Sequence, residues 1–225
     1  MKKTYNLAFL VLIILCLSVS IFVGCGSNNT PDTGKNNDVS DEISGDSSGI
    51  IESNGNVLVA YFSRRGENWQ VGYIEKGNTE IVAEMIAEET NADLFAIQPV
   101  VPYPDVYSEM LEVSRRETSE NARPAIKNTI ADFDKYDVIF IGYPIWNGTC
   151  PMIIRTFTES YDFSGKTVIP FCTHAGSGLG SSVSAIRSQL QSATVLNGLA
   201  VQGTTAQNNR EETKNTVAKF IKDLN

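Results

Sequence analysis

The stretch Val57-Leu58-Val59-Ala60-Tyr61-Phe62 carries six apolar side chains in succession. A strand with one face in water alternates apolar and polar residues, whereas an unbroken apolar run is typical of a central strand covered on both faces. Residues 57–62 are therefore expected to lie inside a parallel sheet with helices on both sides.

The rest of the chain repeats this unit of a strand followed by a helix. Apolar runs predict further strands, at 94–97, 138–141, 167–172 and 194–201, the last with a candidate bulge at Asn197-Gly198. Apolar residues at helical spacing predict helices at 78–90, 106–121, 152–161, 179–191 and 208–224. Five alternations predict an α/β fold with three layers, a doubly wound five-stranded parallel sheet in the order 2-1-3-4-5. Such sheets bind ligands beyond the carboxyl ends of their strands, here in the loops after strands one, three and four.

The first of these loops begins at Ser63-Arg64 and reaches its helix through Gly77-Asn78-Thr79. The free amide groups and the dipole of a helix N-terminus hold a phosphate well. Gly77 would let the backbone approach such a group, and the hydroxyls of Ser63 and Thr79 would add hydrogen bonds. Gly-Asn-Thr before a helix is also ordinary capping, so a phosphate site and a simple cap remain alternatives.

The second loop, Pro144-Ile145-Trp146-Asn147-Gly148, directly follows Tyr143 at the end of a predicted strand. Two large aromatic residues at this point would form a wall that stacks on a flat ring. The alternative is a hydrophobic turn buried under the neighbouring loop.

The third loop is Thr173-His174-Ala175-Gly176-Ser177-Gly178. Its small residues expose backbone N–H and C=O groups, which suit the polar edge of a ring. It differs from a dinucleotide fingerprint because Ser181 takes the place of the last glycine and because the loop follows strand four. His174 is the single histidine, and it is either a hydrogen-bond donor or proton source at the site, or a loop residue that faces water.

Taken together, these segments resemble a known family in their order and spacing. Tyr61-Phe62-Ser63…Gly77-Asn78-Thr79, Tyr143-Pro144-Ile145-Trp146 and Thr173-His174-x-Gly176-Ser177-Gly178 are similar to motifs of the flavodoxin-like family of short bacterial flavoproteins, over residues 56–224. The resemblance implies FMN as cofactor. Its phosphate would lie against Ser63, Gly77, Asn78 and Thr79, and its isoalloxazine between Pro144 to Gly148 and Thr173 to Gly178.

The chain departs from the family pattern in two places. Residues 64–76 are an insertion, which either folds over the phosphate or ribityl chain, with Arg64 or Arg65 contributing charge, or is a surface excursion. Asn147 stands where a second tryptophan often follows Trp146, so one wall of the ring would be thinner.

Three functions are consistent with these residues. The leading prediction is an electron carrier without catalytic residues, in which a carbonyl near Gly148 accepts a hydrogen bond from the flavin and the partner is a redox protein or a small quinone-like acceptor. The second is an FMN-dependent NAD(P)H:quinone or nitro oxidoreductase, and the third is an anchored binding module without flavin. A serine hydrolase is excluded because Ser177 lies in no Gly-x-Ser-x-Gly motif. One histidine and few cysteines argue against a metal site.

Residues 1–24 are expected to be a lipoprotein signal peptide. Lys2 and Lys3 precede an uncharged apolar run from 7 to 23, and Gly24-Cys25 follows it. This arrangement resembles a bacterial lipobox and implies that Cys25 is the lipid attachment point. An uncleaved anchor helix is the alternative, and both place the domain on the extracytoplasmic face of the cell membrane.

A polar and acidic tether is expected at 25–54, followed by the folded domain at 55–225. The tether has too few apolar residues to offset the entropy of ordering. Of the net charge of −8, the leader carries +2 and the tether −5, which leaves −5 for the domain. An acidic domain without a basic cluster is not expected to bind nucleic acid. In it, Cys150 and Cys172 form either a disulfide or two buried thiols.

Overall fold

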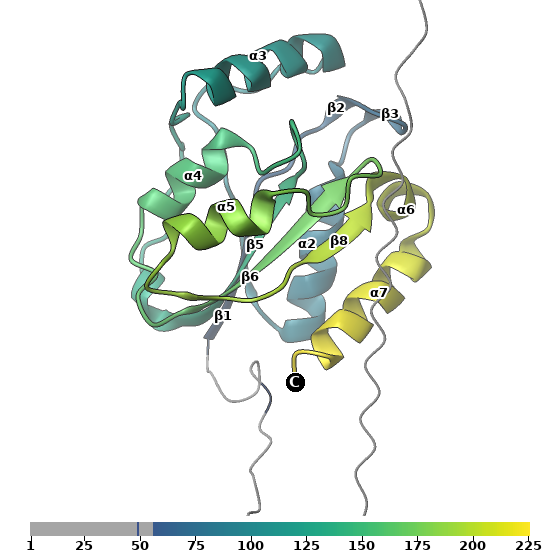
Figure 1. Cartoon of the computed structure of the whole chain (residues 1–225). Helices are drawn as coiled ribbons and strands as arrows, with labels where there is room; N and C mark the ends of the chain where they lie inside the picture. Colours follow the sequence, from purple (N-terminus) through teal and green to yellow (C-terminus); the bar gives the residue numbers. More distant parts are fainter. Residues whose placement is uncertain (1–48, 50–55) are drawn as a thin grey trace, which may run out of the picture. The chain divides into compact units, whose positions relative to one another are not determined.

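Six parallel strands form the central sheet of the computed structural model, which describes Gly49 and residues 56–225 (Figure 1). Along the sheet the order is β4-β1-β5-β6-β7, and β8 also pairs with β6. The strands are β1 (Asn56–Tyr61), β4 (Asp93–Ala96), β5 (Tyr136–Pro144), β6 (Thr167–His174), β7 (Thr194–Val195) and β8 (Leu199–Gln202). β7 and β8 are two parts of the fifth predicted strand. When they are counted as one strand, the observed order is the predicted order 2-1-3-4-5, which is confirmed.

The unbroken apolar runs are explained by burial on both faces of the sheet. Alternate residues of β1 belong to separate cores: Leu58 and Ala60 to one, Val57 and Val59 to the other. All four are buried. Because neither face of the sheet is exposed to water, every position from 57 to 62 is apolar, and apolar and polar residues do not alternate along the strand.

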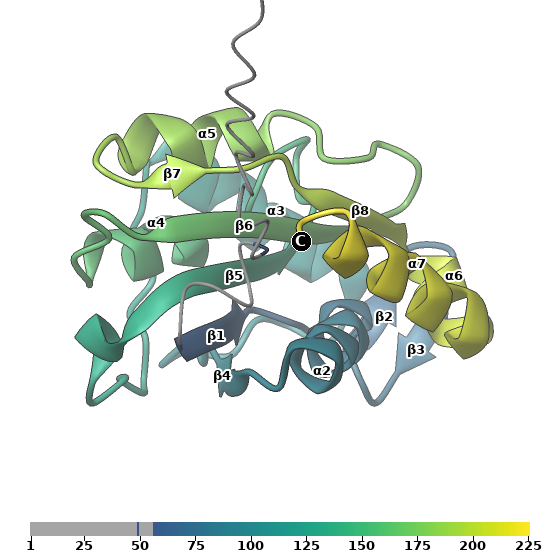
Figure 2. The ribbon, with the colours of Figure 1, turned by 90° about the horizontal axis from the view of Figure 1, so that it is seen from below.

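Helices cover both faces and complete the three predicted layers (Figures 1 and 2). One face is covered by α2 (Asn78–Thr90), α6 (Gly203–Asn208) and α7 (Arg210–Lys222), and the other by α4 (Met152–Glu159) and α5 (Ser182–Gln189), with α3 (Tyr107–Ser119) contributing Met110 to that core. A short 3-10 turn, η1 (Phe133–Lys135), leads into β5. Every helix in the described part is too short or too polar to cross a bilayer.

The fifth predicted strand is interrupted at the candidate bulge. Val195 pairs with Val168, but Leu199 pairs with Phe171, so the offset between partners rises from 27 to 28 residues. One extra residue therefore lies between β7 and β8. Pro170 is opposite the interruption and has no N–H to donate, and a Cβ at Gly198 would be 2.7 Å from the Pro170 carbonyl oxygen.

The insertion contains an element that the sequence analysis missed. Residues of β2 (Gly66–Asn68) pair antiparallel with those of β3 (Gly72–Ile74), which makes a small hairpin separate from the main sheet. The predicted helix at 208–224 also differs, because α6 precedes it and α7 begins at Arg210.

Cys150 and Cys172 are both buried and both free, so the thiol alternative holds. The expected signal peptide, its Cys25 and the tether fall outside the described residues, apart from Gly49 in the tether.

Candidate functional site

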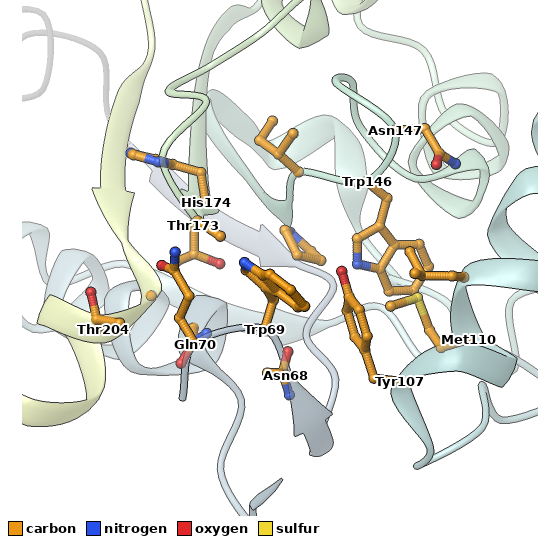
Figure 3. Close-up of a pocket in the computed structure, with 16 residues that line it drawn as sticks. Asn68, Trp69, Gln70, Tyr107, Met110, Trp146, Asn147, Thr173, His174 and Thr204 are labelled. Atoms are coloured by element: carbon orange, nitrogen blue, oxygen red, sulfur yellow. The ribbon is translucent and has the colours of Figure 1, made fainter. Parts of the chain in front are cut away.

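A cleft opens at the carboxyl ends of β5, β6 and β8, where the topology predicts a ligand site (Figure 3). Three predicted loops meet there: Asn78 comes from the first, Pro144 to Asn147 from the second, and Thr173 and His174 from the third. Ala175 also comes from the third loop, and Asn68, Trp69 and Gln70 come from the insertion, for which folding over the ligand was one of the two alternatives. The remaining lining residues were not predicted: Tyr107, Met110, Leu111, Gly203 and Thr204.

The start of α2 is built as an open cradle. Gly77 precedes the helix and provides no side-chain cap, and the first amide groups of any helix have no intrahelical acceptor. The Ser63 hydroxyl accepts a hydrogen bond from the Glu80 N–H at 3.1 Å. A Cβ on Gly77 would be 2.1 Å from Ser63 Oγ, so this approach requires glycine.

Asn78 brings an unsatisfied acceptor to the same place. Its Oδ1 atom is buried and, among the described residues, has no hydrogen-bond partner. A buried carbonyl without a partner costs on the order of 1–3 kcal/mol, which a ligand donor would recover. Gly203 packs against the other side of this amide, since a Cβ there would be 2.5 Å from Asn78 Nδ2.

Thr79 lies behind the cleft and not in its lining. It is 1% exposed, and its Oγ1 is 2.8 Å from Oγ1 of Thr173. This buried hydrogen bond joins the start of α2 to the end of β6. Thr79 therefore fixes the position of the cradle relative to the third loop.

The second loop is a tight turn with most of its aromatic surface buried. Trp146 and Thr149 exchange both backbone hydrogen bonds at 3.0 Å around Asn147 and Gly148, whose φ angles are 50° and 77°. Two successive left-handed residues are typical of a type I′ turn. The Gly148 carbonyl, predicted to face the flavin, accepts hydrogen bonds from the N–H and hydroxyl of Ser181.

Trp146 lines the cleft but is only 7% exposed, and its ring packs edge-on against Phe62 and Tyr103 with centroid distances of 5.4 and 5.0 Å. Tyr143 has no exposed surface, its hydroxyl bonds to Ser182, and burial raises its pKa. Tyr143 is therefore a core residue, as the buried-turn alternative expects.

Asn147 does not present its amide to the cleft. Its Nδ2 donates to Ser114 Oγ on α3 at 2.9 Å, and Figure 3 shows the side chain pointing away from Trp69. The residue ties the second loop to α3.

The third loop places His174 in the cleft wall and uses its glycines to turn. His174 Nδ1 accepts the Gly176 N–H at 3.0 Å, and burial lowers the pKa of the imidazole. The ring is therefore neutral at pH 7 with its proton on Nε2. Gly176 and Gly178 have φ angles of 123° and 61°, and neither they nor Ser177 are among the described residues that line the cleft.

Arg64 has a role in the fold. The side chain is buried, and its guanidinium donates to the carbonyls of Glu67, Pro104 and Asp105. Burial lowers the pKa of this group. These hydrogen bonds hold the base of the hairpin against the segment before α3, so they are not directed to a ligand. Arg65, also suggested as a source of charge, pairs with Asp105 on the surface.

The fold and cleft define a doubly wound α/β domain with a ligand site at its switch point, formed by a helix N-terminus and two loops that follow parallel strands.

Comparison with known proteins gives the family. The flavodoxin family model matches residues 56–220. A search of curated protein sequences found no match.

Solved structures agree with this assignment. A candidate flavoprotein from Bacteroides eggerthii has 30% sequence identity and a TM-score of 0.62, over 76% of this chain and 98% of that one. One from Bacteroides uniformis has 31% identity and a TM-score of 0.61, over 75% and 99%. A flavoprotein from Lactobacillus acidophilus, solved in complex with FMN, has 22% identity and a TM-score of 0.53, over 68% and 97%. The chain belongs to the flavodoxin family.

Proposed function

We propose that this protein binds FMN in the cleft and transfers electrons as a membrane-anchored carrier. The observation that carries the proposal is the cradle at the start of α2, where the buried Asn78 Oδ1 has no partner among the described residues, Gly77 provides no side-chain cap, and the Ser63 hydroxyl lies beside the Glu80 amide. This arrangement has donors for a phosphate and an acceptor for a hydroxyl. The FMN in the complex of the Lactobacillus acidophilus relative supports the choice of ligand.

The residues present fit each part of FMN. The amides at the start of α2, with the hydroxyl of Ser63 beside them, would hold the phosphate. Asn78 Oδ1 would accept from a ribityl hydroxyl. Thr173, His174 and the turn at 144–147 would hold the ring.

When bound, FMN supplies one- and two-electron chemistry, while the chain sets affinity and potential. The domain's net charge of −5 disfavours additional negative charge in the cleft, and it would therefore lower the reduction potential of a flavin bound there. Burial lowers the pKa of His174, and its Nδ1 accepts from Gly176, so the ring offers an Nε2–H as a hydrogen-bond donor without adding positive charge.

The proposal includes a location and a partner. Cys25, following the apolar run of the leader, would carry a lipid and hold the domain on the extracytoplasmic face of the membrane. The acidic domain suits a redox protein with a basic face, or a small quinone-like acceptor. Replacement of Cys25 by serine is expected to move the protein from the membrane fraction to the soluble fraction of a bacterial host.

The test of flavin binding is titration of the purified full chain with FMN and with riboflavin, which lacks the phosphate. Asn78→Asp places a negative charge in the cradle and is expected to weaken FMN binding by about tenfold or more, with a much smaller effect on riboflavin. Asn91→Asp, at the other end of α2, is the matched control and is expected to bind both as the wild type does. A wild-type chain that binds neither flavin would refute the proposal.

Steady-state oxidation of NAD(P)H in the presence of a quinone separates the carrier from the oxidoreductase. A carrier is expected to show no turnover above that of free FMN.

A further inference from the structure

The geometry points to a second use of the insertion: the tip of the β2–β3 hairpin is a movable outer wall of the cleft, and Trp69 at this tip stacks on the flat ring of the cofactor. The inference rests on the proposed function and deepens it, because it assigns the ring-binding aromatic residue to the insertion.

Trp69 is an exposed aromatic residue placed where a flat ligand needs one. It is 60% exposed and lines the cleft together with Tyr107 (Figure 3). The two ring centroids are 5.8 Å apart, with an angle of 32° between the planes. An indole left this accessible gains little from folding, and beside Tyr107 it provides aromatic surface for a flat ligand in the cleft.

The other aromatic residues near the cleft cannot provide a broad stacking surface. Trp146 is 7% exposed and packed against Phe62 and Tyr103, and Tyr143 has no exposed surface. Within the described residues, accessible aromatic surface on the cleft therefore comes mainly from Trp69 and Tyr107.

The base of the hairpin is fixed to the body of the domain. Arg64 donates to three carbonyls there, the Glu67 N–H donates to the Asp105 carbonyl at 2.7 Å, and the Tyr107 N–H donates to the Glu67 carboxylate at 3.0 Å. These contacts give the tip a rigid support beside the cleft.

The tip itself is held mainly by its own turn. The Val71 N–H donates to the Asn68 carbonyl at 3.3 Å, and Gln70 and Gly72 have φ angles of 67° and 75°. A Cβ on Gly72 would have no atom within 4 Å. The tip can therefore shift while the base stays in place.

The size of the cleft is consistent with such a shift. The space beside Trp69 is about 130 Å³, whereas pockets for ligands of this kind usually measure about 300–1,000 Å³. Outward movement of the tip opens the cleft by separating Trp69 from Tyr107, and return of the indole onto the ring closes it. Stacking of the indole on the ring is expected to contribute about as much binding free energy as one aromatic pair.

The experiment is flavin titration of the full chain with three variants: Trp69→Phe, Trp69→Ala and Tyr73→Ala. Tyr73 is the matched control, because it is an aromatic residue of the same hairpin, 57% exposed, and is not among the residues that line the cleft. Trp69→Ala is expected to weaken FMN and riboflavin equally, by about tenfold, which corresponds to about 1.4 kcal/mol. Trp69→Phe should stay within about threefold of the wild type, and Tyr73→Ala should be unchanged.

A spectroscopic readout is independent of affinity. An indole stacked on oxidised flavin gives a long-wavelength charge-transfer absorption, which is expected in the wild type and in Tyr73→Ala, and is expected to be lost in Trp69→Phe. Trp146 is the only other tryptophan and remains in every variant. A wild-type protein that binds flavin, with Trp69→Ala equal to Tyr73→Ala in affinity and absorption, would overturn the inference and leave the proposed function standing. Absence of flavin binding in the wild type would instead refute the proposed function.

Discussion

Replacement of Arg64 by methionine is expected to destabilise the apo protein by about 2–4 kcal/mol. Methionine keeps most of the apolar stem of arginine but removes the guanidinium. The substitution therefore leaves the carbonyls of Glu67, Pro104 and Asp105 without the donor that now binds them.

The magnitude follows from three charge-assisted hydrogen bonds and the cost of burying their donor. At about 1.5–3 kcal/mol each, the bonds would contribute roughly 4.5–9 kcal/mol if they were independent. They are not independent, because Nη1 serves both Pro104 and Asp105, at 2.8 and 3.1 Å. The buried guanidinium also pays for desolvation, and within the described residues its Nε has no acceptor. The net effect is therefore about half of the sum or less.

Urea unfolding of the full chain measures this effect, with Arg65→Met as control. The Arg65 side chain is 65% exposed and makes one ion pair, at 3.6 Å to Asp105, so its replacement should cost less than about 1 kcal/mol. Hydrogen exchange is expected to show loss of protection at the Glu67 amide in Arg64→Met only. Equal stability of the two variants, with weaker FMN binding in Arg64→Met, would refute the reasoning and make Arg64 a phosphate ligand.

Three further outcomes are expected. Gly142→Ala should cost about 1–3 kcal/mol in urea unfolding, because the new Cβ would be 2.1 Å from the Phe171 ring; no loss would show that the ring can move aside. Burial lowers the pKa of His174 in the folded protein below its ordinary value of 6.5. At pH values between the folded pKa and 6.5, the unfolded chain therefore binds more protons than the folded protein. The free energy of unfolding is expected to decrease as the pH falls through that window. Unfolding at pH 7.5 and 5.5 should show a smaller decrease in His174→Gln than in the wild type, and NMR of the single imidazole gives the pKa directly. The thiols of Cys150 and Cys172, with pKa values raised by burial, to about 12 for Cys172, should resist a thiol reagent at pH 8 until urea unfolds the domain.

The central sheet was predictable because its strands are buried on both faces. Unbroken apolar runs such as 57–62 and 138–141 leave no polar position, and their alternation with helical spacing specifies parallel pairing. The position of the site followed from the topology, so Asn78, Trp146 and His174 could be brought together from residues distant in the sequence.

The hairpin was not predictable by the same means. Its strands have three residues each and contain glycine and polar side chains, so no apolar period marks them. What stabilises it is the Arg64 guanidinium, whose acceptors are backbone carbonyls up to 41 residues away. Backbone carbonyls carry no sequence signal, so a buried arginine of this kind looks like a phosphate ligand until the structure shows its partners. The glycines at 66 and 72 on either side of Trp69 were the available hint of a turn.

The position of Trp69 also bears on the choice between carrier and oxidoreductase. Hydride transfer from a nicotinamide requires the two reacting rings to lie face to face at contact distance, and an indole over the outer face of the flavin would occupy that position. Electron transfer to a redox protein needs only close approach to an edge of the ring. A chain with Trp69 closed over its cofactor is therefore suited to a protein partner, whereas an oxidoreductase would have to hold the hairpin open through each turnover. The same hairpin that completes the flavin site would thus select the carrier function.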